Sequence, residues 1–218
     1  MTACPARYRG HMKILVTGFE PFGQDAENAS GMVVERLRDH SWGENLYVVT
    51  ATLPVTWAGS VPALLEAIET HRPHAVVALG EAGGRAVVTP ERRARNLGHG
   101  RISDNDDAAR PPSPLDDGPD WLESRIDPES LIKVIRSVNV PAEISNDAGA
   151  FLCNAVYRAL LNETDLPGTF VHVPAVRTQG TATVGRETDP TAAASLTELS
   201  VDQLVDAIAA CVRQISRH

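Results

Sequence analysis

The sequence predicts an α/β fold in which a mostly parallel, twisted sheet is covered by helices on both faces. The prediction depends on order: short apolar runs alternate along the chain with segments that show helical spacing. Such alternation is typical of βα units, in which each helix returns the chain to a parallel neighbouring strand. The chain has 218 residues, 43% of them hydrophobic, which is enough for a single domain with a substantial core.

Short apolar runs indicate the strands. Residues 13–17 form such a run and Gly18 closes it, as expected of a buried strand. Similar runs predict further strands over 47–52, 75–79, 142–145 and 169–173, with a shorter β-prone run over 86–89. We expect ligands near the ends of these strands, because the sites of open α/β sheets lie outside the carboxyl ends.

Capping residues indicate where the helices begin. Serine, threonine, asparagine and aspartate are preferred as caps because their side chains accept hydrogen bonds from the first free backbone N–H groups. A proline in the first helical turn and a capping box are further indications of a helix start. The predicted caps are Asn28 or Ser30, Ser60 before Pro62, Asp127 before Pro128, and Ser200 in a capping box with Gln203.

Composition and charge exclude several classes of partner. The formal net charge is -8 and no Lys/Arg-rich run offsets it, which argues against nucleic acid or an anionic membrane as the main partner. No apolar run reaches the ~18 residues of a membrane span. The histidines and cysteines lack the spacing of metal ligands, and we expect neither a metal nor another cofactor.

The cysteines Cys4, Cys153 and Cys211 are odd in number, which does not suggest a disulfide framework. A reducing cytoplasm fits this pattern best, because it would keep the thiols free. Residues 1–11 lack the apolar core of a signal peptide. We expect them to be a disordered extension in front of a single domain over 12–218.

Two segments are predicted to lack regular structure. Residues 96–118 are polar, rich in proline and aspartate, and too long for an ordinary connection. We expect this segment to be a loop that is mobile alone and orders over a bound ligand. The Thr- and Ala-rich stretch 178–195 is expected to be a mobile connection before the last helix.

Cys153 is the most informative residue of the chain. Small residues at 148–150 lead directly into an apolar stretch with helical spacing, which places the sulfur at or near a helix N-terminus. The free N–H groups and the positive end of the helix dipole favour a thiolate there. The alternative is that Cys153 is a small core residue, as a lone cysteine in an apolar helix usually is.

A histidine and a carboxylate could complete a nucleophilic site. His172 stands at the end of a predicted strand, where its imidazole could take the proton of Cys153 and later deliver it to a leaving group. Glu91 is the candidate for the group that orients the imidazole. The alternatives are a strand-end histidine with a structural role, and a glutamate on the surface or in a first helical turn.

Phenylalanines occur close to the candidate nucleophile and to the first strand. Phe19 and Phe22 flank a tight turn after that strand, and Phe151 lies just before Cys153. They form either a small apolar slot beside the thiol or a part of the core. The glycine-rich residues 80–84 follow another strand, but they lack the spacing of a P-loop or a dinucleotide site.

Taken together, these segments resemble the pyroglutamyl peptidase I family, also called the pyrrolidone-carboxylate peptidases. The resemblance extends from Lys13 to about Gln179. Each motif alone is weakly specific, whereas their order along the chain is highly specific. The motifs are VTGFEPFG at 16–23, GEAGGR at 80–85, TPER at 89–92, RISDN at 101–105, ISNDAGAFLCN at 144–154 and FVHVP at 170–174.

The resemblance implies a fold, a reaction and partners. The family has a single three-layer αβα domain, often assembled as a homotetramer, and removes N-terminal pyroglutamate from peptides through a thioester acyl-enzyme. By resemblance, Cys153 is the nucleophile, His172 is the general base and then the acid, and Glu91 is the orienting carboxylate. Arg101 matches the residue that stabilises the oxyanion together with the backbone N–H of Cys153.

The resemblance also implies a pocket for the pyrrolidone ring of the substrate. The apolar slot of the family matches Phe19, Phe22, Ile102 and Phe151 in this chain. Glu81 lies where the family contacts the polar edge of the lactam. Such a slot suits a neutral lactam, because the ring needs only apolar walls and a few backbone hydrogen bonds.

The chain departs from the family in and near this pocket. Glu81 replaces a common glutamine, and Arg93 and Arg95 replace residues that are usually apolar. Two other hypotheses therefore stay open. One is a related cysteine hydrolase with a shifted lactam specificity, and the other is a small-ligand-binding domain in which catalysis is weakened.

Overall fold

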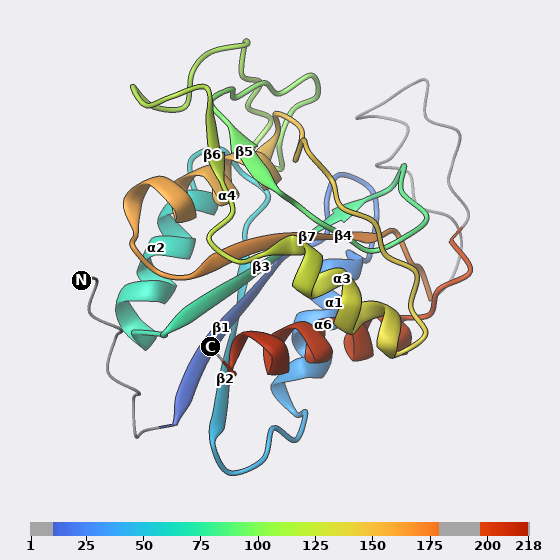
Figure 1. The fold of residues 1–218 in the computed structure, drawn as a ribbon. Helices are drawn as coiled ribbons and strands as arrows, with labels where there is room; N and C mark the ends of the chain where they lie inside the picture. The colour runs from blue at the N-terminus through green and yellow to red at the C-terminus, as the bar shows by residue number, and fades with distance from the viewer. Residues whose placement is uncertain (1–10, 179–196, 218) are drawn as a thin grey trace, which may run out of the picture.

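The computed structural model describes residues 11–178 and 197–217, and Figure 1 shows the arrangement of its elements. The expectations for residues 1–10 and 179–195 lie outside these ranges. The main sheet has the strand order β2-β1-β3-β7-β4. Its strands are β1 (Met12–Phe19), β2 (Leu46–Leu53), β3 (Ala75–Ala82), β4 (Thr89–Pro90) and β7 (Gly168–Pro174).

Parallel pairing dominates this sheet. β1 pairs in parallel with both β2 and β3, and β3 pairs in parallel with β7, whereas the short β4 is antiparallel to β7. The predicted α/β class with a mostly parallel sheet is therefore confirmed. The register places Gly80 beside His172 at the carboxyl ends of β3 and β7, which brings two of the sequence motifs to one edge.

Helices cover both faces of the sheet, so that the molecule has three layers (Figure 1). α1 (Ala29–Arg38), α3 (Pro128–Ser137) and α6 (Val201–Ile215) pack on one face, and α2 (Ser60–His71) and α4 (Leu152–Glu163) on the other. The side chains of β1 alternate accordingly: Ile14 and Val16 pack with the first group and Leu15 with the second. None of the helices described by the structure has the length and apolar character that crossing a bilayer requires.

Three helices begin at the caps that the sequence predicts. The side chain of Asn28 accepts a hydrogen bond from the Ser30 N–H at 3.0 Å, at the start of α1. Asp127 caps α3 in the same way, and Ser200 and Gln203 form the capping box of α6. These caps satisfy N–H groups that the helices themselves leave free.

The predicted cap Ser60 is wrong. Gly59 is the N-cap of α2 and Ser60 is its first helical residue. The reason lies one turn upstream, where the Thr56 side chain accepts a hydrogen bond from the Gly59 N–H at 3.0 Å. The chain therefore turns into the helix before Ser60 is reached.

The strands predicted over 86–89 and 142–145 are shorter than expected. Only β4 forms in the first region, and the second forms no continuous strand. The chain makes two isolated parallel bridges there, Val88 to Ala142 and Glu91 to Ser145. Between them lies Pro90, which has no N–H and cannot donate the hydrogen bond that would join the two bridges into one ladder.

The long loop over 96–118 contains no helix or strand, as predicted, but it is anchored at both ends. β5 (Arg93–Arg95) and β6 (Trp121–Glu123) form an antiparallel pair that flanks it, which the sequence did not indicate. Inside it, the Asn96 side chain binds the backbone of Leu115, Asp116 and Gly118. These contacts favour an ordered loop over the mobility that its composition suggests.

A buried ion pair fixes the end of this loop to α4. The guanidinium of Arg158 donates to both carboxylate oxygens of Asp116, at 2.8 and 2.7 Å. The Arg158 side chain is only 1% exposed. Since a buried guanidinium is costly unless it is paired, Asp116 is required where it stands.

We predict that Asp116→Asn lowers the free energy of unfolding by about 3 kcal/mol, because it leaves the buried Arg158 without its carboxylate. The hydrogen bonds from Arg158 hold the pKa of Asp116 below its ordinary value, although burial acts against them. The stabilisation is therefore complete above the unfolded-state pKa, about pH 4, and is lost as the pH falls through the lower folded-state pKa. Urea denaturation at pH 7 and at lower pH measures both effects.

The neighbouring Asp117 provides a matched control, because it is exposed and lies outside this ion pair. Asp117→Asn removes the same charge and is expected to change the free energy of unfolding by less than about 0.5 kcal/mol. Equal losses in the two variants would contradict the prediction.

Candidate active site

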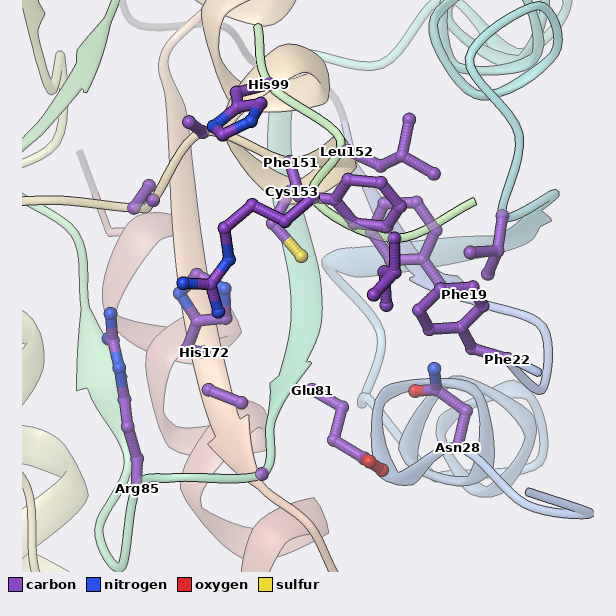
Figure 2. A pocket seen from close by; sticks show the side chains of 18 of the residues that line it. Phe19, Phe22, Asn28, Glu81, Arg85, His99, Phe151, Leu152, Cys153 and His172 are labelled. Carbon is purple, nitrogen blue, oxygen red and sulfur yellow. The ribbon is translucent and has the colours of Figure 1, made fainter. Parts of the chain in front are cut away.

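A cavity of about 470 Å³ lies at the carboxyl ends of the central strands, beside the N-terminus of α4 (Figure 2). Its wall brings together nearly all the predicted site residues, namely Phe19, Phe22, Glu81, Arg101, Ile102, Phe151, Cys153 and His172. Glu91 is fully buried and does not line the cavity. Within the described ranges, no group of His, Cys, Asp and Glu side chains is arranged to hold a metal ion.

Cys153 lies at the start of α4, where its sequence context predicts it. Phe151 is the N-cap of the helix, and Gly149 in the preceding turn has a φ of 84°, which favours glycine. The sulfur packs directly over Gly80, because a Cβ added there would lie 2.6 Å from Sγ. Gly80 therefore makes room for the thiol next to the strand that carries His172.

His172 and Glu91 form a buried pair. His172 Nδ1 and Glu91 Oε1 lie 2.7 Å apart, and the two side chains are 5% and 0% exposed. An ionised carboxylate only accepts hydrogen bonds, so Nδ1 carries the proton and Nε2 is the basic nitrogen of the ring. This tautomer is the one that a general base for the thiol requires.

Arg85 contacts both the acidic partner of His172 and the turn that precedes Cys153. One of its Nη atoms donates to Glu91 Oε1 at 2.7 Å and also binds Thr89, while the other donates to the carbonyl of Asp147 at 3.2 Å. The sequence indicates Arg85 only as part of a motif. Its role follows from the fold, which brings Glu91 and the turn at Asp147 to the same guanidinium.

Burial controls the ionisation of the three central groups. It raises the pKa of the Cys153 thiol to about 12, and Arg85 opposes this shift while Glu91 and Glu81 add to it. Burial also lowers the pKa of His172, although the hydrogen bond that His172 donates to Glu91 acts in the opposite direction.

For Glu91, burial alone would raise the pKa, but the hydrogen bond that His172 donates and the charge of Arg85 hold it below its ordinary value. At neutral pH the site therefore contains a carboxylate, a neutral imidazole and a thiol. Burial therefore acts against the thiolate that the position of Cys153 at a helix N-terminus favours.

Arg101 and Ile102 reach the cavity from the long loop. Arg101 is exposed and Ile102 is half-buried. The side chain of Asn105 fixes this part of the loop against the segment after β1: it accepts from the Gly23 N–H at 3.1 Å and donates to the Pro21 carbonyl at 3.0 Å. The two segments therefore form adjoining parts of one wall.

Aromatic rings form the apolar wall. The ring centroids of Phe22 and Phe151 lie 5.6 Å apart, and Trp57 meets Phe151 edge-on at 5.3 Å. Phe19 and Phe22 are buried as well as lining the cavity, so they serve the core and the slot together. Trp57 does not itself line the cavity and supports this wall through its contact with Phe151.

Glu81 lies in the cavity wall, but its carboxylate is engaged by other groups. Arg177 donates to it with both Nη atoms, at 2.6 and 2.7 Å, and the Ala29 N–H donates at 2.6 Å. Arg177 also donates to Asp25 at 2.6 Å. Burial by itself would lower the pKa of Arg177, but the bonds and charges of Glu81 and Asp25 raise it.

Arg93 and Arg95 support the turn that leads to the thiol. Arg93 Nε donates to the Asn146 carbonyl at 3.0 Å, and Arg95 donates to the Asp147 carboxylate at 3.3 Å. Both guanidinium groups lie over the ring of Trp121, at 4.1 and 5.5 Å from its centroid. The two departures from the family pattern are therefore well accommodated.

The fold and the site define a class of protein. A cysteine at a helix N-terminus, beside a buried imidazole–carboxylate pair on an α/β sheet, is the arrangement of a cysteine peptidase, a hydrolase. The sequence pattern of the family described as pyroglutamyl peptidase matches residues 12–218. The chain belongs to this family, and the expected resemblance is confirmed.

Relatives and solved structures agree with this assignment. The chain is 37% identical over 168 residues to the pyrrolidone-carboxylate peptidase of Bacillus licheniformis, covering 74% of this chain and 78% of that protein. It is 36% identical over 183 residues to the protein of the same name from Gloeobacter violaceus, covering 79% and 89%.

The crystal structure of pyroglutamyl peptidase I from Bacillus amyloliquefaciens is similar with a TM-score of 0.84 and 29% identity, covering 95% of this chain and 96% of that chain. The pyrrolidone carboxyl peptidase of Thermococcus litoralis is similar with a TM-score of 0.79 and 27% identity, covering 93% and 92%. Both matches extend over nearly the whole fold.

We predict that alkylation of Cys153 by iodoacetamide accelerates about tenfold per pH unit between pH 7 and 9. Because the pKa of the thiol is raised, the reactive thiolate is a small fraction that grows with pH over this range. Mass spectrometry of the labelled peptide separates Cys153 from the other cysteines and measures the rate.

Cys211 is the internal reference, since it is fully buried in α6 and is expected to stay unlabelled while the protein is folded. A rate for Cys153 that is already constant below pH 7 would contradict the prediction, because it would mean a thiolate–imidazolium pair at rest.

Proposed function

We propose that this protein is a cysteine exopeptidase that removes N-terminal pyroglutamate (5-oxoproline) from peptides, with residues 12–218 as the catalytic domain. The observation that supports this most is the 2.7 Å contact of His172 Nδ1 with Glu91 Oε1, beside the position over which the Cys153 sulfur packs. The names of the relatives point to the same reaction. Cys153, His172 and Glu91 are the proposed catalytic triad.

His172 acts first as a general base. Its Nε2 takes the proton from Cys153 while Sγ attacks the carbonyl carbon of the pyroglutamyl residue and a C–S bond forms. Glu91 transfers no proton; it keeps Nδ1 protonated and stabilises the imidazolium. Since burial favours the neutral thiol and imidazole, charge separation accompanies the attack and does not precede it.

The negative charge then moves to the carbonyl oxygen. The backbone N–H of Cys153 belongs to the first turn of α4, whose N–H groups have no partner within the helix, and it can donate to this oxyanion. The exposed guanidinium of Arg101, in the same cavity wall, is the second proposed donor. Its position on a loop allows it to approach when the substrate is bound.

The tetrahedral intermediate collapses to a thioester. The C–N bond breaks, and the imidazolium of His172 delivers its proton to the leaving amine of the shortened peptide. Water then attacks the thioester and gives its proton to His172. The C–S bond breaks, pyroglutamate leaves, and the proton returns to Cys153. Residues of the chain and water account for every proton in these steps.

The cavity suits the ring of the substrate. A pyrrolidone ring has apolar faces and a neutral amide edge, and it carries no α-ammonium group. Phe19, Phe22, Ile102 and Phe151 provide apolar surface next to Cys153, while the end of β3 at Glu81 provides backbone groups for the amide edge. Such a slot favours the lactam over a charged N-terminal residue.

We predict that the purified protein releases the fluorophore from a pyroglutamyl amide and leaves the corresponding prolyl amide intact. Cys153→Ala is expected to abolish turnover, because the nucleophile is lost. Cys211→Ala is the matched control and is expected to keep kcat, since Cys211 lies in the core on the far face of the sheet. Absence of turnover in the wild type, or turnover that survives Cys153→Ala, would refute the proposal.

We predict that kcat/KM falls on the acid side of its pH profile, with the acid limb below pH 6.5. His172 is active as the neutral base, and burial lowers its pKa, so protonation stops the reaction only at a lower pH than for an ordinary histidine. Glu91→Gln is expected to lower kcat/KM on the order of 10³-fold and to move the acid limb further down, because the Glu91 charge raises the pKa of His172.

Glu91→Asp retains the charge with a shorter side chain and is the control for this variant. An unchanged acid limb in Glu91→Gln would show that Glu91 does not act through the imidazole. Thermal unfolding of each variant separates loss of the fold from loss of the reaction.

The alternative hypotheses have less support. The hypothesis of a shifted lactam specificity depends on the carboxylate of Glu81, but both oxygens of this group are bound by Arg177 and Ala29. The hypothesis of a weakened binding domain depends on the altered residues 93–103, which include Arg93 and Arg95, but Asn105 anchors this loop next to the cavity. We retain the peptidase as the proposal.

The cellular setting and assembly are part of the proposal. A reducing compartment keeps a thiol nucleophile reduced, which points to the cytoplasm, and Cys153 and Cys211 are both free. Assembly as a homotetramer is implied by the family resemblance, and light scattering of the purified protein tests it.

A further inference from the structure

A buried cluster of charges lies behind the cavity wall. Arg177 follows β7, and its side chain is only 6% exposed. It donates to both oxygens of Glu81, at 2.6 and 2.7 Å, and to Asp25 at 2.6 Å. The side chains of Glu81 and Asp25 are 4% and 5% exposed, so these charges interact with little screening from water.

Only Glu81 of this cluster belongs to the wall of the cavity. In Figure 2 its carboxylate points away from the sulfur of Cys153 and towards Asn28, at the beginning of α1. There the Ala29 N–H donates to it at 2.6 Å. Arg177 and the helix N-terminus together therefore hold the carboxylate out of the space beside the thiol.

The charge of Glu81 is nevertheless close enough to matter for the reaction. It contributes to the raised pKa of Cys153. Without a cation, a buried carboxylate would retain water, and an apolar slot that retains water binds a neutral ring poorly. The affinity of the slot formed by Phe19, Phe22 and Phe151 for a neutral ring therefore depends on whether the charge of Glu81 is neutralised.

We propose that Arg177 is a positioning residue that sets the specificity of the site: it neutralises Glu81 from behind the wall, so that a cavity containing a carboxylate accepts an uncharged lactam. The inference rests on the proposed function for the identity of the lactam. The pairing also explains how a glutamate is accommodated where the family commonly has a glutamine, since the glutamate with its arginine presents a compensated group to the cavity.

The first test compares the variants Arg177→Met, Arg177→Lys and Glu81→Gln/Arg177→Met on the pyroglutamyl amide. Arg177→Met leaves the carboxylate uncompensated, and we expect KM to rise on the order of tenfold or more with a smaller change in kcat. Arg177→Lys keeps the charge and is expected to keep most of the affinity. The double variant removes both charges of the pair and is expected to recover most of the loss.

The second test needs no peptidase activity. Methanethiosulfonate reagents that differ only in charge, one cationic and one anionic, are reacted with Cys153, and labelling is followed by mass spectrometry. The ratio of the cationic to the anionic rate cancels any general change in thiol reactivity. We expect this ratio to rise on the order of tenfold in Arg177→Met and to return towards the wild-type value in the double variant.

The outcomes separate the inference from the proposed function. If the wild type does not cleave the pyroglutamyl amide but the labelling ratios change as expected, the proposed function fails and the role of Arg177 in the charge of the site stands. If Arg177→Met and the double variant give the same KM and the same ratio, compensation of Glu81 is refuted and Arg177 only supports the fold.

Should Arg177→Met fail to fold, Arg177→Gln replaces it, because the amide keeps a hydrogen-bond donor for Glu81 without the charge. Its labelling ratio is then compared with that of Arg177→Lys. Equal ratios in these two variants would overturn the proposal, and a higher ratio in Arg177→Gln would support it.

Discussion

Glu91 is enclosed by the protein, and four contacts to it connect the parts of the site. Its Oε1 accepts hydrogen bonds from His172 and Arg85, each at 2.7 Å. Its backbone N–H donates to the Phe170 carbonyl at 2.9 Å, and its carbonyl accepts from the Tyr157 hydroxyl at 3.1 Å. The strand that carries the base and the helix that carries the thiol therefore meet at one residue, and the buried charge is tolerated because the Arg85 guanidinium and the His172 N–H both bind its Oε1.

The layered fold could be predicted from the sequence because its determinants are local. Alternating apolar runs and helical segments indicate the sheet and the helices, and Asn28, Asp127 and Ser200 cap helices for reasons contained in a few neighbouring residues. The residues of the candidate site could be identified because several motifs occur in a specific order along the chain, and the fold places most of these residues around one cavity. Cys153 at a helix start followed from the small residues before it.

Other features depend on contacts between distant segments and could not be predicted. The missing N–H of Pro90 interrupts a ladder whose existence only the fold reveals, and the ionisation of Cys153 depends on its burial as well as on its helix. Nothing in the local sequence indicates a role for Arg177, which in the folded protein donates to both Asp25 and Glu81. A motif describes one segment of the chain, whereas charge compensation requires side chains from two different segments.

The pairing of Glu81 with Arg177 limits the order in which these two residues can be substituted. Because Arg177 also binds Asp25, a chain with a neutral amide at position 81 would still have a partner for the arginine. A chain with Glu81 but without Arg177 would carry buried carboxylates facing one another with no guanidinium between them. The arginine must therefore be present before the glutamate is tolerated, and a return to the neutral residue must change position 81 before the arginine is lost.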